Sequence, residues 1–146
     1  MFFQKFATVA YTKGFEFQII QPFIKEIATK RLLGNITVLL CGETNVVKYD
    51  KGKKSVIDYF GVLKAIPSET RIILNPVHDR MTRFEMKLKR AFLSKHNRLV
   101  ISVWNKGKTD KKGKNRDGRN PPWTIYSDGK EINMQREYID DLSFPH

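Results

Sequence analysis

The sequence contains one cysteine, Cys41, so disulfides within the chain cannot hold the fold together. We therefore expect a fold that rests on packing, in a chain suited to a reducing compartment. No apolar run approaches the roughly 18 residues that span a bilayer, and the longest covers only residues 36–41. The first residues also lack the pattern of a secretory signal. These absences predict an intracellular protein, in the cytoplasm of the host cell if viral, without a membrane partner.

Several catalytic signatures are also missing. His78, His96 and His146 are scattered and accompany a single cysteine, so no paired zinc ligands occur. No nucleophile-elbow sequence supports a Ser/His/Asp triad. No GxGxxG motif or P-loop occurs, which leaves an organic nucleotide cofactor unsupported. These absences disfavour zinc chemistry, acyl transfer and cofactor-dependent reactions.

Acidic residues are scarce between residues 80 and 119. This stretch carries 14 Lys or Arg and three acidic residues, a net charge of +11, whereas the whole 146-residue chain carries +12. A basic segment on a nearly neutral scaffold is typical of a surface that binds an anionic partner. We expect that partner to be nucleic acid, with DNA favoured. The alternative is a solvated surface that has no ligand.

The length and the hydrophobic periodicity predict the fold class. A chain of 146 residues suits a single domain with a substantial core. The alternation of elements predicts an α/β or α+β domain, with a mixed sheet of about four to six strands, about three helices and a C-terminal β-hairpin. The predicted helices cover residues 16–31, 55–66 and 82–94, and the predicted strands cover 36–41, 71–74, 99–104, 123–126 and 130–132, with a further candidate at 6–11.

Three local signals set predicted boundaries. Gly34-Asn35 is expected to cap the first helix, and Asn75-Pro76 to end the strand at 71–74. Asp128-Gly129 supplies the backbone conformation of a two-residue hairpin turn. Residues 105–120 contain seven Lys or Arg and no large apolar side chain, which predicts a mobile loop.

The basic segment divides into the solvent side of the helix at 82–94 and the loop that follows the next strand. Lys and Arg there would contact phosphates, with strong salt dependence and little sequence selectivity. The predicted nucleic-acid-binding residues are Arg80, Arg83, Lys87, Lys89, Arg90, Lys106, Lys108, Lys111, Lys112, Lys114, Arg116 and Arg119.

A cluster of chemically active groups follows the strand at 71–74. His78, Asp79 and Glu85 lie where open α/β sheets usually bind ligands, at the carboxyl end of a strand. Carboxylates can hold Mg²⁺ or orient a water, so these residues are candidates for phosphodiester hydrolysis, with Glu85 and Asp79 as metal ligands. The alternative for Glu85 is a capping box with Thr82, and His78 and Asp79 could satisfy local backbone groups.

Glu43 offers a further carboxylate at the end of the strand at 36–41, although its sequence context, Gly42 to Asn45, is also ordinary turn chemistry. Glu85 and Lys87 match half of a widespread nuclease core in which both side chains lie on a strand. On a helix, residues two apart point about 200° apart, so the pair could not line one site together. Trp104 and Trp123 are candidates for the core or for stacking on unpaired bases.

The run from Arg83 to Lys87, within a small, Lys-rich chain, resembles the small nuclease family of filamentous viruses of hyperthermophilic archaea over roughly residues 71–104. The resemblance implies an endonuclease on linear double-stranded DNA that uses one essential glutamate, which corresponds to Glu85. The leading hypothesis is thus a Mg²⁺-dependent deoxyribonuclease. The alternatives are a non-catalytic DNA-binding protein for compaction or regulation, and a structural protein that binds an acidic protein surface.

Overall fold

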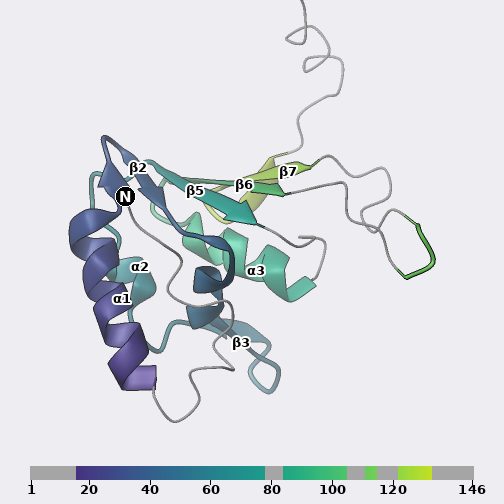
Figure 1. Ribbon diagram of the computed structural model, residues 1–146, viewed down its shortest axis with the longest axis horizontal. Helices are drawn as coiled ribbons and strands as arrows, with labels where there is room; N and C mark the ends of the chain where they lie inside the picture. Colours follow the sequence, from purple (N-terminus) through teal and green to yellow (C-terminus); the bar gives the residue numbers. More distant parts are fainter. Residues whose placement is uncertain (1–15, 78–83, 105–110, 115–121, 133–146) are drawn as a thin grey trace, which may run out of the picture.

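The computed structural model describes residues 16–77, 84–104, 111–114 and 122–132 (Figure 1). The helices are α1 (Glu16–Lys30), the 3-10 helix η2 (Cys41–Val46), α2 (Val62–Ala65) and α3 (Phe84–Leu93). The strands are β1 (Leu32–Leu33), β2 (Ile36–Val38), β3 (Lys48–Asp50), β4 (Ser55–Ile57), β5 (Ile72–Val77), β6 (Leu99–Trp104), β7 (Trp123–Ser127) and β8 (Lys130–Ile132). These elements confirm a mixed α+β fold with a C-terminal β-hairpin.

The main sheet has six strands in the order β1-β2-β5-β6-β7-β8. The three inner strands β2, β5 and β6 are parallel, and β1, β7 and β8 join as antiparallel neighbours. A separate two-stranded sheet pairs β3 with β4. Because β2, β5 and β6 are parallel, their carboxyl ends lie at the same edge of the sheet.

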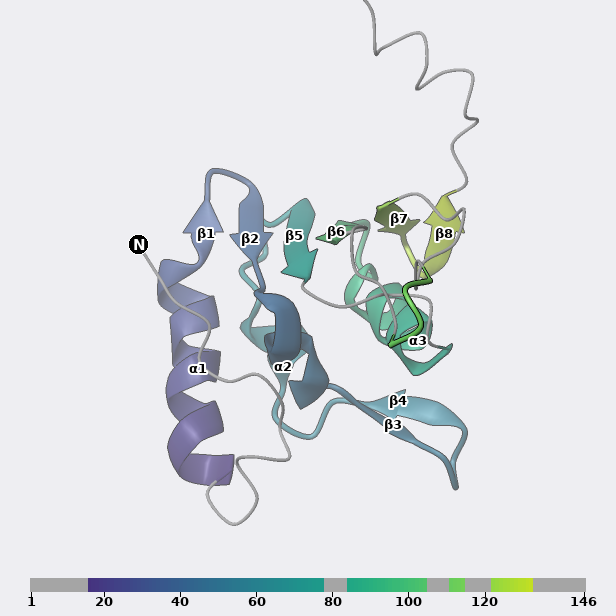
Figure 2. The ribbon, with the colours of Figure 1, turned by 45° about the vertical axis from the view of Figure 1, so that its right-hand side comes forward.

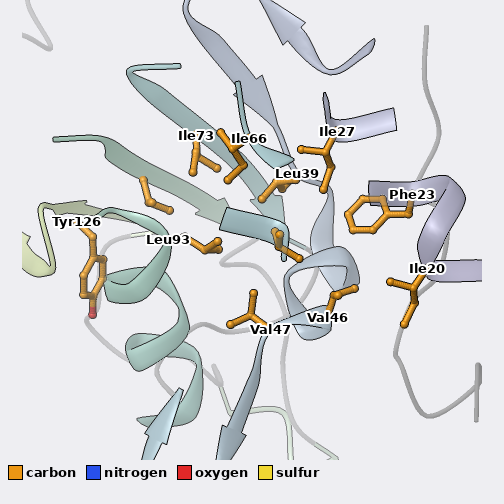
Figure 3. Close-up of a cluster of buried hydrophobic side chains, with 12 residues drawn as sticks. Ile20, Phe23, Ile27, Leu39, Val46, Val47, Ile66, Ile73, Leu93 and Tyr126 are labelled. Atoms are coloured by element: carbon orange, nitrogen blue, oxygen red, sulfur yellow. The ribbon is translucent and has the colours of Figure 1, made fainter. Parts of the chain in front are cut away.

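The described helices all lie on one side of the main sheet (Figures 1 and 2). The hydrophobic core fills the space between the sheet and these helices. Figure 3 shows Ile20, Phe23 and Ile27 of α1 directed toward the sheet residue Ile73 and toward Leu39. All five side chains are at most 1% exposed. Each large apolar side chain buried in this way stabilises the fold by about 1.5–3 kcal/mol. The apolar residues whose helical spacing predicted α1 are thus the ones that it buries against the sheet.

Two tight turns join neighbouring strands. Gly129 and Asp128 both have positive φ, 88° and 44°, as the predicted two-residue hairpin turn between β7 and β8 requires. Gly34 also has positive φ, 65°, but the predicted helix cap is wrong. Leu33 pairs with Ile36, so residues 34 and 35 form a hairpin turn between β1 and β2, and α1 already ends at Lys30.

The predicted helix at 55–66 is wrong in its first half. Ser55, Val56 and Ile57 form β4, since β-branched side chains favour the pairing with β3 over a helix. Only four residues, Val62–Ala65, form α2. Asp58 holds the start of this short helix, because its carboxylate accepts hydrogen bonds from the backbone N–H groups of residues 62 and 63 at 2.8 and 2.9 Å.

Two strand boundaries also differ from their predictions. β5 continues through Pro76 to Val77, because β2 pairs with it only as far as Leu74. Beyond that point β5 has one neighbour, β6, and proline is tolerated in a strand paired on one side. β2 in turn ends at Val38, and the chain enters η2 at Cys41.

A buried ion pair fixes the chain where β2 leads into η2. Arg31 follows α1, and its guanidinium donates to both carboxylate oxygens of Glu43 at 2.8 and 2.9 Å. It also donates to the carbonyl of Val38, while Glu43 accepts from the backbone N–H of Leu40 at 2.8 Å. Both side chains are 0% exposed. Burial lowers the pKa of Arg31, but Glu43 and, to a lesser degree, Glu26, whose carboxylate lies 3.5 Å from Nε, together outweigh this effect and the pKa is raised.

No helix among the described residues is long and apolar enough to cross a membrane. The candidate strand at 6–11 lies outside the described residues, as does most of the predicted loop at 105–120.

Replacing Glu43 with Gln should destabilise the protein by about 3 kcal/mol, because it removes the carboxylate that binds both terminal nitrogens of the buried guanidinium and leaves the more distant Glu26, at 3.5 Å from Nε, to balance the Arg31 charge. Urea unfolding followed by circular dichroism measures this difference. The matched control is Glu69→Gln, an exposed glutamate before β5, which should change the free energy of unfolding by less than about 0.5 kcal/mol. Equal stability of the two variants would contradict the anchoring role of the ion pair.

Candidate functional site

A hollow of about 450 Å³ lies where η2 meets the first turns of α3. It is lined by Asn45 of η2 and by Phe84, Glu85, Met86 and Lys89 of α3. Both elements follow parallel strands, since η2 comes after β2 and α3 comes after β5. Figure 1 shows η2 and the start of α3 on the helix-covered side of the sheet, near the carboxyl ends of its parallel strands. The hollow that they line is therefore at the edge where ligands bind in open α/β sheets.

Two opposite charges share this hollow. Glu85 and Lys89 are four residues apart in α3, a spacing that places side chains on one face of a helix. Glu85 is exposed, whereas Lys89 is only 8% exposed and its Nζ donates to Oδ1 of Asn45 at 3.3 Å. Asn45 thus helps to hold an ammonium group beside a solvent-accessible carboxylate. The exposed Lys87 is not among the lining residues, as expected for a residue two positions from Glu85 on a helix.

Sequence reasoning missed Asn45. It stands in the segment that supplied Glu43, but the polar residue that reaches the hollow is two positions further along. The signal available was the place of this segment at the carboxyl end of a predicted strand. The sequence does not show which of its side chains faces the neighbouring helix.

Glu43 does not line the hollow, contrary to its predicted place among metal ligands. Both of its carboxylate oxygens are bonded to Arg31, and its side chain is 0% exposed. The interpretation of this segment as a turn is the better one, because the Glu43 carboxylate accepts a hydrogen bond from the backbone N–H of Leu40, at the start of η2. Among the described residues, no three His, Cys, Asp or Glu side chains gather in a way that could hold a metal ion.

Arg90 and Lys89 do not lie on the solvent side of α3, so that prediction is wrong. Arg90 is 1% exposed, and it donates to the carbonyl of Met86 and to the hydroxyl of Thr124. Its guanidinium also lies 5.3 Å from the centre of the Tyr126 ring. Burial lowers the pKa of Arg90, with Tyr126 and Glu131 opposing that effect. Arg90 therefore ties α3 to β7.

The first residue of α3 is apolar but does not belong to the core. Phe84 is 65% exposed and meets the Tyr49 ring edge to face, with the ring centres 6.0 Å apart. Leu93, at the other end of the helix, is fully buried. The buried residues of α3 are Lys89, Arg90 and Leu93, all in its second half. The helix itself is confirmed over Phe84–Leu93.

Four of the predicted nucleic-acid-binding residues are exposed as expected. Lys87 lies on α3, and Lys111, Lys112 and Lys114 follow β6 along the chain. Figure 1 shows the segment 111–114 beyond the carboxyl ends of β5 and β6, on the side where α3 begins. The remaining predicted site residues lie outside the described part of the chain: His78, Asp79, Arg80, Arg83, Lys106, Lys108, Arg116 and Arg119.

The two tryptophans differ in exposure. Trp104 is 5% exposed at the end of β6, which agrees with a place in the core, and Trp123 is half-buried at the start of β7. Arg98, another cation of the basic segment, is also buried and donates to the carbonyls of Thr70 and Pro67 at 3.2 and 3.1 Å. Burial, and to a lesser degree Arg71, lowers the pKa of Arg98.

Comparison of the chain with protein-family models, with curated proteins and with solved structures finds no match. The resemblance to the small viral nucleases therefore remains an expectation from the sequence.

Replacing Arg90 with Met should cost about 1.5–3 kcal/mol of stability, since hydrogen bonds from a charged donor have values in this range. Lys87→Met is the matched control on the same helix. Lys87 is exposed, so its replacement should change stability by less than about 0.5 kcal/mol. Urea unfolding curves of the two variants give the comparison. A stable Arg90→Met protein would show that Arg90 is not a structural tie.

Proposed function

We propose that the protein binds nucleic acid at the carboxyl edge of its main sheet and hydrolyses phosphodiester bonds in the hollow between η2 and α3. The observation that carries this proposal is the pairing of Glu85 and Lys89 in one hollow, an accessible carboxylate beside a largely buried ammonium group. Exposed lysines at 87, 111, 112 and 114 supply positive charge for the flanking phosphates.

The hollow suits a phosphate group for electrostatic reasons. The first turn of α3 lines it, and the N-terminal end of a ten-residue helix carries a partial positive charge. The ammonium group of Lys89, held by Asn45, adds a full charge in a position partly screened from water. A volume of about 450 Å³ also falls within the roughly 300–1,000 Å³ typical of ligand pockets.

In the reaction, the Glu85 carboxylate would take a proton from a water molecule that attacks the phosphorus. A bond forms between the water oxygen and phosphorus, and the bond to the leaving sugar oxygen breaks, with solvent protonating that oxygen. Lys89 would stabilise the additional negative charge on the phosphorane, which develops only in the transition state. Glu85 acts as general base and Lys89 as electrostatic stabiliser.

A Mg²⁺ ion also belongs to the proposal. Magnesium is usually bound by one or two carboxylates together with substrate phosphates and water. Glu85 is the single carboxylate that lines the hollow among the described residues, so the described donors alone do not form a metal site. Asp79, which lies outside the described residues, is the second carboxylate that we propose for the metal. A bound ion would neutralise phosphate charge.

Binding without catalysis is the second candidate. It is favoured by the loss of Glu43 to its ion pair with Arg31, which leaves one accessible carboxylate in the described part of the hollow. In this case Glu85 has no chemical role and repels phosphate weakly.

The variant Glu85→Gln separates the two candidates. We expect cleavage of linear and supercoiled DNA in the presence of Mg²⁺, and a loss of about 10²–10⁴-fold in rate without the carboxylate. Glu69→Gln is the matched control, because residue 69 precedes β5 at the opposite edge of the sheet, and it should cleave at the wild-type rate.

Undiminished cleavage by Glu85→Gln would remove Glu85 from the mechanism. A wild-type protein that binds DNA without cleaving it, with tighter binding by Glu85→Gln, would favour the non-catalytic candidate. A chelator in place of Mg²⁺ tests the metal requirement in the same assay.

The exposed lysines generate a separate prediction about salt dependence. Replacing Lys111, Lys112 and Lys114 with Gln should lower the slope of log affinity against log salt by about 2–3, since each contact with a duplex phosphate contributes about 0.9. The charge-matched control replaces Lys25, Lys30 and Lys64, which are exposed on α1 and α2. Fluorescence anisotropy with a labelled duplex measures both slopes, and equal slopes would exclude the segment 111–114 from the interface.

A further inference from the structure

The main sheet has a second face that no described element covers. α1, α2, α3 and η2 all lie on the opposite side, as Figures 1 and 2 show. Ile73 and Val100 point toward those helices and are 0% exposed. Because side chains alternate along a strand, the residues on either side of these two point to the uncovered face.

This uncovered face is apolar across the whole sheet. The strand register places Ile36, Ile72 and Leu99 in one row, and Val38, Leu74 and Ile101 in the next. Extended over all six strands of the main sheet, the same alternation gives fourteen outward positions, of which twelve are apolar. The exceptions are Ser127 and Lys130 at one corner. In a chain with 29% charged residues, this surface is almost free of charge.

Several of these side chains are open to solvent. Leu33 is 59% exposed, Val103 46%, Ile132 40% and Leu74 36%, and together they extend from β1 to β8. Antiparallel sheets in water usually alternate apolar and polar residues, whereas strands with two apolar faces are typical of sheets covered on both sides. Monomeric soluble proteins rarely expose a continuous apolar patch above roughly 300–600 Å². The strands thus have the composition of a sheet that is covered on both faces.

The dimensions of the face indicate what covers it. Neighbouring strands lie about 4.8 Å apart, so six strands extend over roughly 24 Å. A helix with its side chains is about 10–12 Å wide and would cover less than half of that width. Another six-stranded sheet has the required width, and two sheets pack face to face about 10 Å apart with their apolar side chains interdigitated.

We propose that this face is the interface of a symmetric homodimer, in which the sheets of two copies of the chain pack against each other. A two-fold axis brings the same patch together from both copies, so each apolar row meets apolar side chains. Lys130 lies at one corner of the face, and the exposed lysines proposed for nucleic acid do not oppose the association, because Lys87 lies on α3, behind the sheet, and segment 111–114 lies beyond its carboxyl edge (Figure 1). The fourteen outward residues would form the centre of an interface of standard size, about 800 Å² per partner.

The proposal does not depend on the proposed function, and its test uses protein freed of nucleic acid. Light scattering coupled to size-exclusion chromatography should give twice the chain mass of 17.1 kDa for the wild type. The double variant Leu74→Lys/Val103→Lys puts two charges at the centre of the face and should elute as a monomer. Tyr59→Lys is the control, since Tyr59 is 64% exposed but lies outside the sheet, and it should remain dimeric.

A second measurement covers the case in which the double variant fails to fold. The melting temperature of a dimer rises with protein concentration, whereas that of a monomer does not. We expect the wild type to show this rise. A wild-type protein of monomer mass with a constant melting temperature would overturn the proposal, as would a folded double variant that remains dimeric.

Discussion

The buried contact between Arg31 and Glu43 is the constraint on which the position of the candidate site depends. Two charges without solvent access are costly, and they persist because the guanidinium and the carboxylate satisfy each other and two backbone groups. Arg31 follows α1 and Glu43 lies in η2, so the pair joins the first helix to the chain that leaves β2. Asn45 follows two residues later and therefore reaches Lys89 in the hollow.

A second buried cation completes this arrangement from the other side. Arg90 joins α3 to β7 through Thr124 and Tyr126, and this contact fixes which face of the helix is turned toward the sheet. Glu85, one turn earlier, is left facing the hollow and the solvent. Two arginines that make no use of their charge at the surface thus position the carboxylate and the ammonium group of the candidate site.

The sequence predicted the elements with strong, regular patterns. α1 and β6 were found because their apolar residues recur at helical or strand spacing over many positions, and the turn at Asp128-Gly129 because few other residue pairs adopt its backbone conformation. The short strands β3 and β4 were missed, and β5 was predicted too short. Their boundaries depend on which strand lies beside them, as the tolerance of Pro76 shows, and local sequence does not contain that information.

The site was predicted in part, for a related reason. Glu85 was identified from its place after a strand within a basic segment, and it does line a hollow. Glu43 was assigned from its place at the end of a predicted strand, and Lys89 and Arg90 from their place in a basic helix. Neither position in the sequence shows whether a side chain is buried. Among the described cations of segment 80–119, Lys89, Arg90 and Arg98 are buried, so the surface charge is smaller than the net +11 of the sequence suggests.

The proposed binding of nucleic acid at the carboxyl edge of the sheet can be tested by an NMR titration of isotope-labelled protein with a short DNA duplex. We expect the largest shifts in amide signals at Asn45, Glu85, Lys89 and residues 111–114, and none at Lys25 or Lys64. Shifts confined to α1 and α2, or none at low salt, would contradict it.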